Sequence, residues 1–244
     1  MIDLRGVTRT FDGKVAVRNL TLSISPGCIF ACVGPNGAGK TTTIRMIAGL
    51  LLPTSGTIAV GGYDVVREPV GAKRLLGYIP DQPFLYDKLT GREFLQFVGR
   101  IYLMPYADIE RAVADYAGLF EMSDYLDELC ESYSHGMKQR VVLASALMHD
   151  PRVIVVDEPM VGLDPAGVRL VSDLLRRRAR DGVAVFMCTH TLSLVEAIAD
   201  EVGVLHKAEL LYRGPVVDLR AGVGGGKLED AFFQLTAEEN VNRA

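Results

Sequence analysis

The chain carries the segment Gly34-Pro35-Asn36-Gly37-Ala38-Gly39-Lys40-Thr41, which fits the pattern G-x-x-x-x-G-K-[ST]. Glycines let a backbone curl until several N–H groups point at one anion, and a following helix adds its positive dipole end. Lys40 supplies a mobile positive charge for nucleotide phosphates, and the Thr41 hydroxyl is an oxygen ligand for Mg²⁺. The segment, together with Thr42, therefore predicts a phosphate-binding loop rather than a turn that only caps a helix.

Strands and helices alternate around this loop. The apolar run Ile29–Val33 before it has the length and flanks of a buried strand. Apolar residues after it, spaced i, i+3, i+4, i+7, predict a helix that Pro53 ends; they are Ile44, Ile47, Ala48 and Leu51. Runs 153–156, 183–188 and 202–205 predict further buried strands, and Asp164-Pro165 begins another helix. The alternation predicts an α/β fold with a mostly parallel sheet.

Other segments depart from this alternation. Residues 90–147 have a helical pattern, which indicates a helical insertion into the α/β core. The first 25 residues and 56–63 predict short antiparallel strands. Gly224-Gly225-Gly226 predicts a flexible break before an amphipathic segment, 228–235. We therefore expect one domain over 1–220, with a helical subdomain at about 88–148, followed by a tail at 221–244.

Composition excludes several classes of protein. Hydrophobic residues make up 49% and charged residues 23% of the 244, which argues against disorder in most of the chain. A net charge of −4 argues against a protein that binds nucleic acid. We find no apolar run of the roughly 18 residues that span a bilayer, and no signal peptide at the start. The four cysteines form no CxxC pair and are expected to be small buried side chains in a reducing cytoplasm.

Two adjacent carboxylates follow the run at 153–156. Ligands collect at the carboxyl ends of parallel strands, where Asp157 and Glu158 are expected to lie. Asp157 is predicted to hold Mg²⁺, and Glu158 to accept a proton from an attacking water. A strand end turning into solvent would explain the pair equally well if it stood alone. Because it follows a phosphate-binding loop, it predicts hydrolysis as well as binding.

Further motifs stand in an order that resembles the ATP-binding subunit of ABC transporters, over about residues 2–215. The resemblance rests on five segments: Phe11-Asp12-Gly13 for the adenine-stacking aromatic, Asp81-Gln82 for the Q-loop, Tyr133-Ser134-His135-Gly136-Met137 for the signature, Gly162-Leu163-Asp164 for the D-loop, and Thr189-His190 for the switch histidine. Taken singly, each has an ordinary structural explanation, such as a core aromatic, a helix cap or a strand-end histidine.

The resemblance implies a P-loop NTPase (RecA-like) core with an N-terminal antiparallel β subdomain and a helical insertion subdomain. In the family two subunits face each other, and ATP lies between the phosphate-binding loop of one and the signature of the other. Ser134 and Gly136 would then bind the other subunit's ATP, Phe11 would stack on adenine, and His190 would sense the γ-phosphate. The implied cofactors are ATP and Mg²⁺. The implied partners are a membrane-spanning permease and a second copy or a paralogous subunit, at the cytoplasmic face of the membrane.

The sequence departs from the family pattern at three places, of which one, Thr191 in place of the aspartate that often follows the histidine, affects only an outer contact. His135 replaces the first signature glycine and Met137 replaces a glutamine, which leaves open how closely the backbone approaches phosphate. In the Q-loop the family glutamine falls on Asp81, with Gln82 one place late, so that either could face the metal.

Three functions are compatible with these motifs. The leading one is the ATP-hydrolysing subunit of a transporter, of the exporter type. The second is an ABC-type ATPase without a transport role, although such relatives carry tandem cassettes or long insertions that this chain lacks. The third is a regulatory subunit that does not hydrolyse ATP; Lys40, Asp157, Glu158 and His190 argue against it.

Overall fold

A computed structural model of the chain describes residues 1–221 and 227–242, and side chains as far as residue 237. The strands are β1 (Ile2–Phe11), β2 (Lys14–Ile24), β3 (Ile29–Val33), β4 (Ser55–Val60), β5 (Tyr63–Asp64), β6 (Leu76–Ile79), β7 (Val153–Asp157), β8 (Ala184–Cys188), β9 (Glu201–His206) and β10 (Glu209–Pro215). The helices are α1 (Lys40–Ile47), α2 (Pro69–Arg74), α3 (Gly91–Ile101), α4 (Tyr106–Leu119), α5 (His135–Leu147), α6 (Pro165–Arg180), α7 (Leu192–Ile198), α8 (Val216–Ala221) and α9 (Leu228–Asn242), with a 3₁₀ turn at Cys130–Ser132. The predicted break at Gly224–Gly226 lies outside the described residues.

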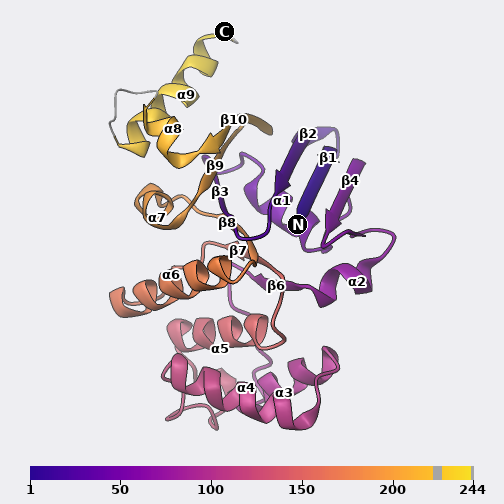
Figure 1. The fold of residues 1–244 in the computed structure, drawn as a ribbon, viewed down its shortest axis with the longest axis vertical. Coiled ribbons are helices and arrows are strands. Elements are labelled where there is room, and N and C mark those ends of the chain that lie inside the picture. The colour runs from indigo at the N-terminus through magenta and orange to yellow at the C-terminus, as the bar shows by residue number, and fades with distance from the viewer. Residues whose placement is uncertain (222–226, 243–244) are drawn as a thin grey trace.

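The central sheet has the strand order β10-β9-β3-β8-β7-β6 (Figure 1). Neighbouring strands from β9 to β6 run parallel, and β10 alone among these six is antiparallel to its neighbour. The predicted α/β fold with a mostly parallel sheet is therefore confirmed. β3, β8 and β7 lie in the middle, so that their carboxyl ends meet at one edge of the sheet.

The alternation of side chains along the strands divides the core in two. Phe30 and Cys32 of β3 face α1 and the N-terminal strands, whereas Ile29, Ala31 and Val33 face the helices on the other side. Every residue of β3, β7 and β8 is buried, as expected for strands covered on both faces. The sheet is thereby a rigid platform for the loops that follow its strands.

A second sheet, with the order β2-β1-β4-β5, is antiparallel throughout. It confirms the antiparallel strands expected near the N-terminus, although β1 and β2, with 10 and 11 residues, are longer than predicted. Alternate residues of β1 such as Ile2 and Leu4 are fully buried against the core that includes α1. This sheet lies beside the central sheet, to the right in Figure 1.

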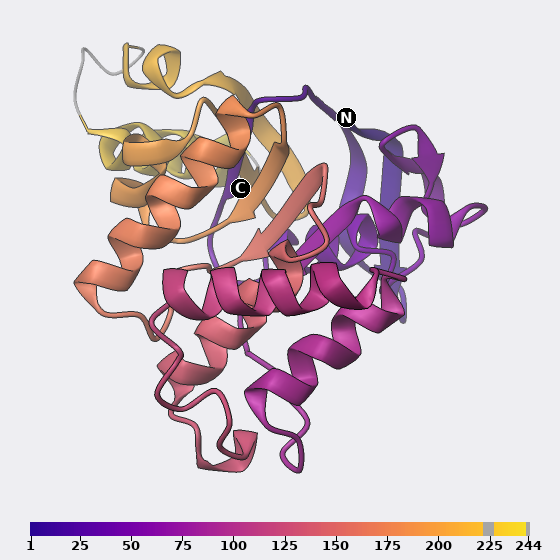
Figure 2. The same ribbon diagram turned by 60° about the horizontal axis from the view of Figure 1, so that its bottom comes forward.

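The stretch predicted to be helical contains α3, α4 and α5. Thr90 begins α3 with a capping box, since its hydroxyl accepts from the backbone of Glu93 while the Glu93 carboxylate accepts from the backbone of Thr90. The three helices form the end of the molecule opposite to α8 and α9, and Figure 2 looks onto that end. Helix α5 packs against β6 and so joins the helical end to the central sheet.

The structure corrects three sequence predictions. Helix α1 ends at Ile47 and does not reach Leu51, because Gly49 adopts φ +64, a conformation typical of a helix C-terminus. The sequence pattern does not predict strand β6, because its residues Leu76-Gly77-Tyr78-Ile79 include a glycine and lead directly into the Q-loop. Strand β10 was not predicted either, because its sequence mixes exposed polar and apolar residues.

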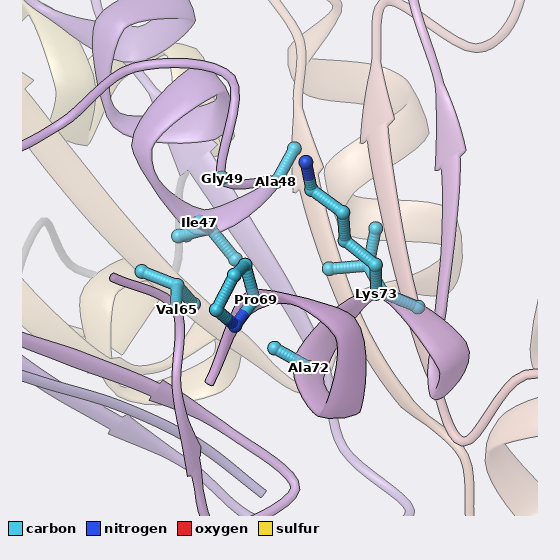
Figure 3. Close-up of a pocket in the computed structure, with 8 residues that line it drawn as sticks. Ile47, Ala48, Gly49, Val65, Pro69, Ala72 and Lys73 are labelled. Atoms are coloured by element: carbon cyan, nitrogen blue, oxygen red, sulfur yellow. The ribbon is translucent and has the colours of Figure 1, made fainter. Parts of the chain in front are cut away.

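A small apolar hollow marks the joint between α1 and α2 (Figure 3). Ile47, Val65 and Ala72 contribute to its wall, and the stem of Lys73 passes over Gly49. The hollow leaves no room for a water molecule, so it is a packing joint and not a binding site.

Candidate functional site

The phosphate-binding loop connects β3 to α1 and is closely packed on both sides. A Cβ atom on Gly34 would lie 2.1 Å from the carbonyl oxygen of Leu205, and one on Gly39 would lie 2.4 Å from that of Ala16. Gly39 begins α1 with φ +110 and offers no side-chain cap, so the first backbone N–H groups of the helix remain available to an anion. Only glycine fits at these two positions, which explains the motif by steric contact.

Lys40 lies inside this loop. Its side chain is buried, with 9% of the residue exposed, and its ammonium donates to the carbonyl oxygens of Gly34 (2.6 Å) and Pro35 (3.1 Å). A lysine ammonium carries three donors, so one remains for a phosphate oxygen. The positive charge therefore lies within the curve of the loop, close to the free N–H groups of α1.

Asp157 ends β7 beside this loop with 3% of its surface exposed. Burial first, and then the negative charge of Asp81, raises the pKa of its carboxyl, while a hydrogen bond from the Thr41 hydroxyl acts in the opposite direction. Within the described part of the chain, the Oδ2 atom of Asp157 is buried without a hydrogen-bond partner. A buried carboxylate with one unpaired oxygen, a second carboxylate nearby and a hydroxyl is a donor set that suits Mg²⁺.

The two Q-loop candidates differ in their relation to this carboxylate. Asp81 Oδ1 accepts from the backbone N–H of Gln82 at 2.8 Å, and the Asp81 charge acts on Asp157. Burial and then the negative charge of Asp157 raise the pKa of Tyr78 in the neighbouring strand β6 to about 12. Asp81 therefore lies close enough for its charge to act on Asp157, whereas the neutral Gln82 has no charge that could do so.

Glu158 and His190, the two predicted catalytic residues, are hydrogen-bonded to each other. Glu158 Oε1 accepts from the backbone N–H of His190 (3.0 Å) and lies 2.8 Å from Nδ1 of its ring. Glu158 has the positive φ of +49, and its backbone N–H donates to Cys188 at the end of β8. The Glu158 side chain is 18% exposed and that of His190 is 69% exposed, so the histidine lies outermost.

The signature residues lie at the start of α5. Exposed Ser134 is its N-cap, and its hydroxyl oxygen accepts from the backbone of Met137 at 3.3 Å. His135 packs against the D-loop, since a Cβ on Gly162 would lie 2.1 Å from its ring. Asp164 caps α6 by accepting from Gly167 (2.7 Å). Signature and D-loop therefore line one shared hollow of about 200 Å³.

Phe11 lies at the end of β1 and is 41% exposed. The guanidinium of Arg9 lies 4.3 Å from the centre of its ring. The partner strand β2 reaches the phosphate-binding loop through Ala16 and Val17, which contact Gly39. The aromatic ring is therefore presented on the hairpin that borders this loop.

The comparisons with known proteins agree on a family. A family model described as ABC transporter matches residues 17–161. The chain is 37% identical over 224 residues to the ABC transporter ATP-binding protein NatA of Bacillus subtilis, an alignment covering 90% of this chain and 91% of NatA. The chain belongs to the ABC transporter family.

Two further similarities cover nearly the whole ABC cassette. The linearmycin resistance ATP-binding protein LnrL of Bacillus subtilis is 32% identical over 244 residues, which is 100% of this chain and 77% of LnrL. A solved structure of the ATP-binding subunit of an ABC transporter matches with a TM-score of 0.92 at 29% identity, covering 97% of this chain and 99% of that one. The protein is an ATP-binding and ATP-hydrolysing subunit of an ABC transporter, a class that dimerises and works with membrane permeases. Among the described residues, no helix is long and apolar enough to cross a membrane.

The structure brings the candidates of this ABC subunit together in two groups. Thr41, Lys40, Asp157 and Glu158 lie at one edge of the central sheet, whereas Ser134, Gly136 and Asp164 surround the signature hollow. One contact residue of the first group, Thr189, was not among the sequence candidates. Its position next to His190 at the end of a buried strand was the available signal, but a threonine there is equally typical of a simple strand end.

Proposed function

We propose that the subunit hydrolyses Mg²⁺-ATP with Glu158 as the general base and His190 as its partner. The supporting observation is the hydrogen-bonded pair of these two side chains beside the loop that contains Lys40. A base must be within hydrogen-bond reach of the proton that it abstracts. The Glu158 side chain is partly exposed at the edge of the sheet, which allows a water molecule to approach it. His190, which is more exposed, would contact the γ-phosphate of a bound nucleotide and help to hold the attacking water beside Glu158.

Mg²⁺ would be held by Thr41, Asp157 and Asp81. The unpaired Oδ2 of Asp157 and the raised pKa of its buried carboxyl support this assignment, since a divalent cation would compensate the charge. When bound, the cation neutralises charge on the nucleotide phosphates. Lys40 and the N–H groups at the start of α1 orient the same phosphates from the other side.

Two such subunits would share their ATP molecules. Ser134 accepts from the backbone of Met137, so the proton of its hydroxyl remains available to a phosphate oxygen. The exposure of Ser134 and the packing of His135 on Gly162 support a surface that meets a second subunit. Whether that subunit is a second copy or a paralogue does not change this chemistry.

The permease would dock on aromatic side chains that follow the Q-loop. Phe84 is 70% exposed, and Tyr86 joins it to Phe97, with ring centres 5.7 and 5.8 Å apart. Exposed clustered aromatic rings are typical of protein interaction surfaces. The patch begins two residues after Gln82, so docking there would act on the short segment of backbone that carries the proposed Mg²⁺ ligand Asp81. This arrangement would hold the subunit at the cytoplasmic face of the membrane.

We infer an exporter because LnrL is named for resistance to linearmycin, a role that fits removal of a compound from the cell. Purification of the native membrane complex tests the transport role. A co-purifying integral membrane protein is expected; recovery of the ATPase without one would favour an ABC-type ATPase that has no transport role.

The variant Glu158→Gln tests the chemistry. The amide preserves shape but cannot accept the proton, so ATP turnover should fall by about 10²- to 10⁴-fold while ATP binding persists. Glu68→Gln, which changes an exposed glutamate at the start of α2, is the matched control and should leave the rate unchanged. A Glu158→Gln rate within twofold of the wild type would exclude Glu158 as the base.

A further inference from the structure

Thr189, the first residue after β8, has a buried hydroxyl at the edge of the site. Only 1% of the residue is exposed. Its backbone N–H donates to the carbonyl oxygen of Cys32 at 3.3 Å, which ties it to β3, the strand that leads into the phosphate-binding loop. Its side chain makes two further hydrogen bonds, one with Thr191 and one with Glu158.

The direction of these two bonds follows from the chemistry of the groups. A backbone N–H can only donate, so Thr189 Oγ1 accepts from Thr191 N at 3.1 Å. The hydroxyl has a single proton, and an ionised carboxylate can only accept. That proton therefore points to Glu158 Oε2, which lies 3.1 Å away.

The two oxygens of Glu158 thus have different anchors. Oε1 is held by His190, whose side chain is 69% exposed, and Oε2 is held by Thr189, which is buried. An exposed ring can turn towards a phosphate at little cost in packing. The buried Thr189 hydroxyl stays in place, because Thr191 N–H donates to it and the Thr189 backbone is tied to Cys32. When the His190 ring turns to the nucleotide, Oε1 keeps its bond from the backbone N–H of His190, and Thr189 is the side chain that still holds Oε2 and so fixes the plane of the carboxylate.

We propose that Thr189 is a positioning residue of the ATPase, whose buried hydroxyl holds the Glu158 carboxylate in line with the attacking water. This inference rests on the proposed role of Glu158 as the general base. Thr189 acts through that carboxylate, since its side chain hydrogen-bonds Glu158 and Thr191 and its backbone N–H donates to Cys32. Loss of the hydroxyl should therefore lower turnover without weakening ATP binding.

The experiment compares Thr189→Val, which keeps the shape and removes the donor, with Thr189→Ser, which keeps the donor. Thr189→Val should lower kcat by about tenfold to a hundredfold, as misplaced catalytic groups do, with the KM for ATP changed by less than about twofold. Thr189→Ser should restore kcat to within about twofold of the wild type. Thr189→Ala serves as a second donor-free variant if Thr189→Val does not fold, and it should show the same loss. Ser172→Ala, which removes a hydroxyl that donates within α6 to Val168, is the control and should change neither parameter.

A double variant separates positioning from a general structural role. In single-turnover assays, adding Thr189→Val to Glu158→Gln should cause no further loss, because the carboxylate through which Thr189 acts is already gone. A full additional loss in that background, a Ser variant as slow as the Val variant, or a Val variant with normal kcat would each overturn the inference. A wild type without ATPase activity, or a fully active Glu158→Gln, would instead overturn the proposed function.

Discussion

The N-termini of α1 and α5, the two halves of the proposed ATP site, are built differently. Helix α1 starts inside a glycine loop, has no side-chain cap and carries the buried cation Lys40 at its first position. Helix α5 starts at the surface, and its own Ser134 caps it. Lys138, a cation in the first turns of α5, lies 3.9 Å from Asp87 and is therefore engaged elsewhere.

Because of this difference, only one half is equipped to bind phosphate without a second subunit. The start of α1 supplies dipole, N–H groups and a positive charge from one chain, which is sufficient for phosphate binding. The start of α5 supplies N–H groups and a hydroxyl, but no free charge of its own. In the proposed shared site, it would meet a phosphate only when a second subunit presents one. Variants in the α1 half should therefore change nucleotide binding by the isolated subunit. Variants in the α5 half should have an effect only in the dimer.

Ser134→Arg is the variant with the largest expected effect, and it tests this difference directly. The bulky cation would obstruct dimer closure, so ATP hydrolysis should be abolished, while nucleotide binding to the isolated subunit stays intact. Ser123→Arg adds the same charge at an exposed position between α4 and the 3₁₀ turn and should leave activity unchanged. If Ser134 were only a cap, the variant would lose about 1 kcal/mol of stability and remain active.

Mixing Ser134→Arg with Lys40→Ala tests whether the two shared sites act independently. In a mixed homodimer, one site has both defects and the other pairs an intact loop with an intact signature. Part of the ATPase activity should therefore return on mixing. No recovery, with mixed dimers shown to form, would contradict independent shared sites.

Lys40→Ala alone should lower affinity for ATP in the isolated subunit. A hydrogen bond to a charged group is worth about 1.5–3 kcal/mol, so the dissociation constant should rise about tenfold to a hundredfold. A titration with a fluorescent nucleotide measures it. An unchanged constant would mean that the α1 half does not bind phosphate by itself.

Asp157→Asn should change the Mg²⁺ concentration that ATPase activity requires more than it changes the affinity for ATP. The amide weakens cation binding, so half-maximal ATPase activity should need about tenfold more Mg²⁺. Without metal the variant should melt at a higher temperature than the wild type, because a buried charge without a counter-ion is removed. Thermal unfolding in a chelator checks this, and a lower melting temperature would contradict the metal assignment.

The smallest effect concerns the far end of the signature helix, where His149 follows α5. Its ring stacks on Tyr102, with ring centres 3.6 Å apart, and burial lowers its pKa from 6.5 to about 4. Between these values the unfolded chain binds the proton and the folded chain does not, so stability should fall as pH drops from about 6.5 towards 4.

His149→Phe keeps an aromatic ring against Tyr102 and should remove this part of the acid sensitivity. Unfolding in urea at pH 7 and pH 5 measures it. An equal loss of stability on acidification in both proteins would show that His149 is not the source of the acid sensitivity.

The phosphate-binding loop, the carboxylate pair and the cap at Asp164 were readable from sequence because each is local. Their chemistry needs particular residue types a few positions apart, and strand and helix signals flank them. The end of α1, by contrast, was placed too late, since the apolar spacing continues to Leu51 while Gly49 already ends the helix. Strand β6 was missed because its stability comes from pairing with β7, which is 77 residues away for the pair Leu76 and Val153.

The alternation of strands and helices, the phosphate-binding loop and the candidate base and metal ligands are predictable from sequence, because backbone geometry and side-chain chemistry act locally; strands β6 and β10 are not. Which candidates share a site depends on the tertiary structure. Parallel pairing of β3, β8 and β7 brings Cys32, Cys188 and Asp157 level, and thereby places Thr189 against Glu158. Packing of α5 against the D-loop likewise placed His135 on Gly162. These contacts join residues tens of positions apart, and the register of the sheet and the burial of its faces select them.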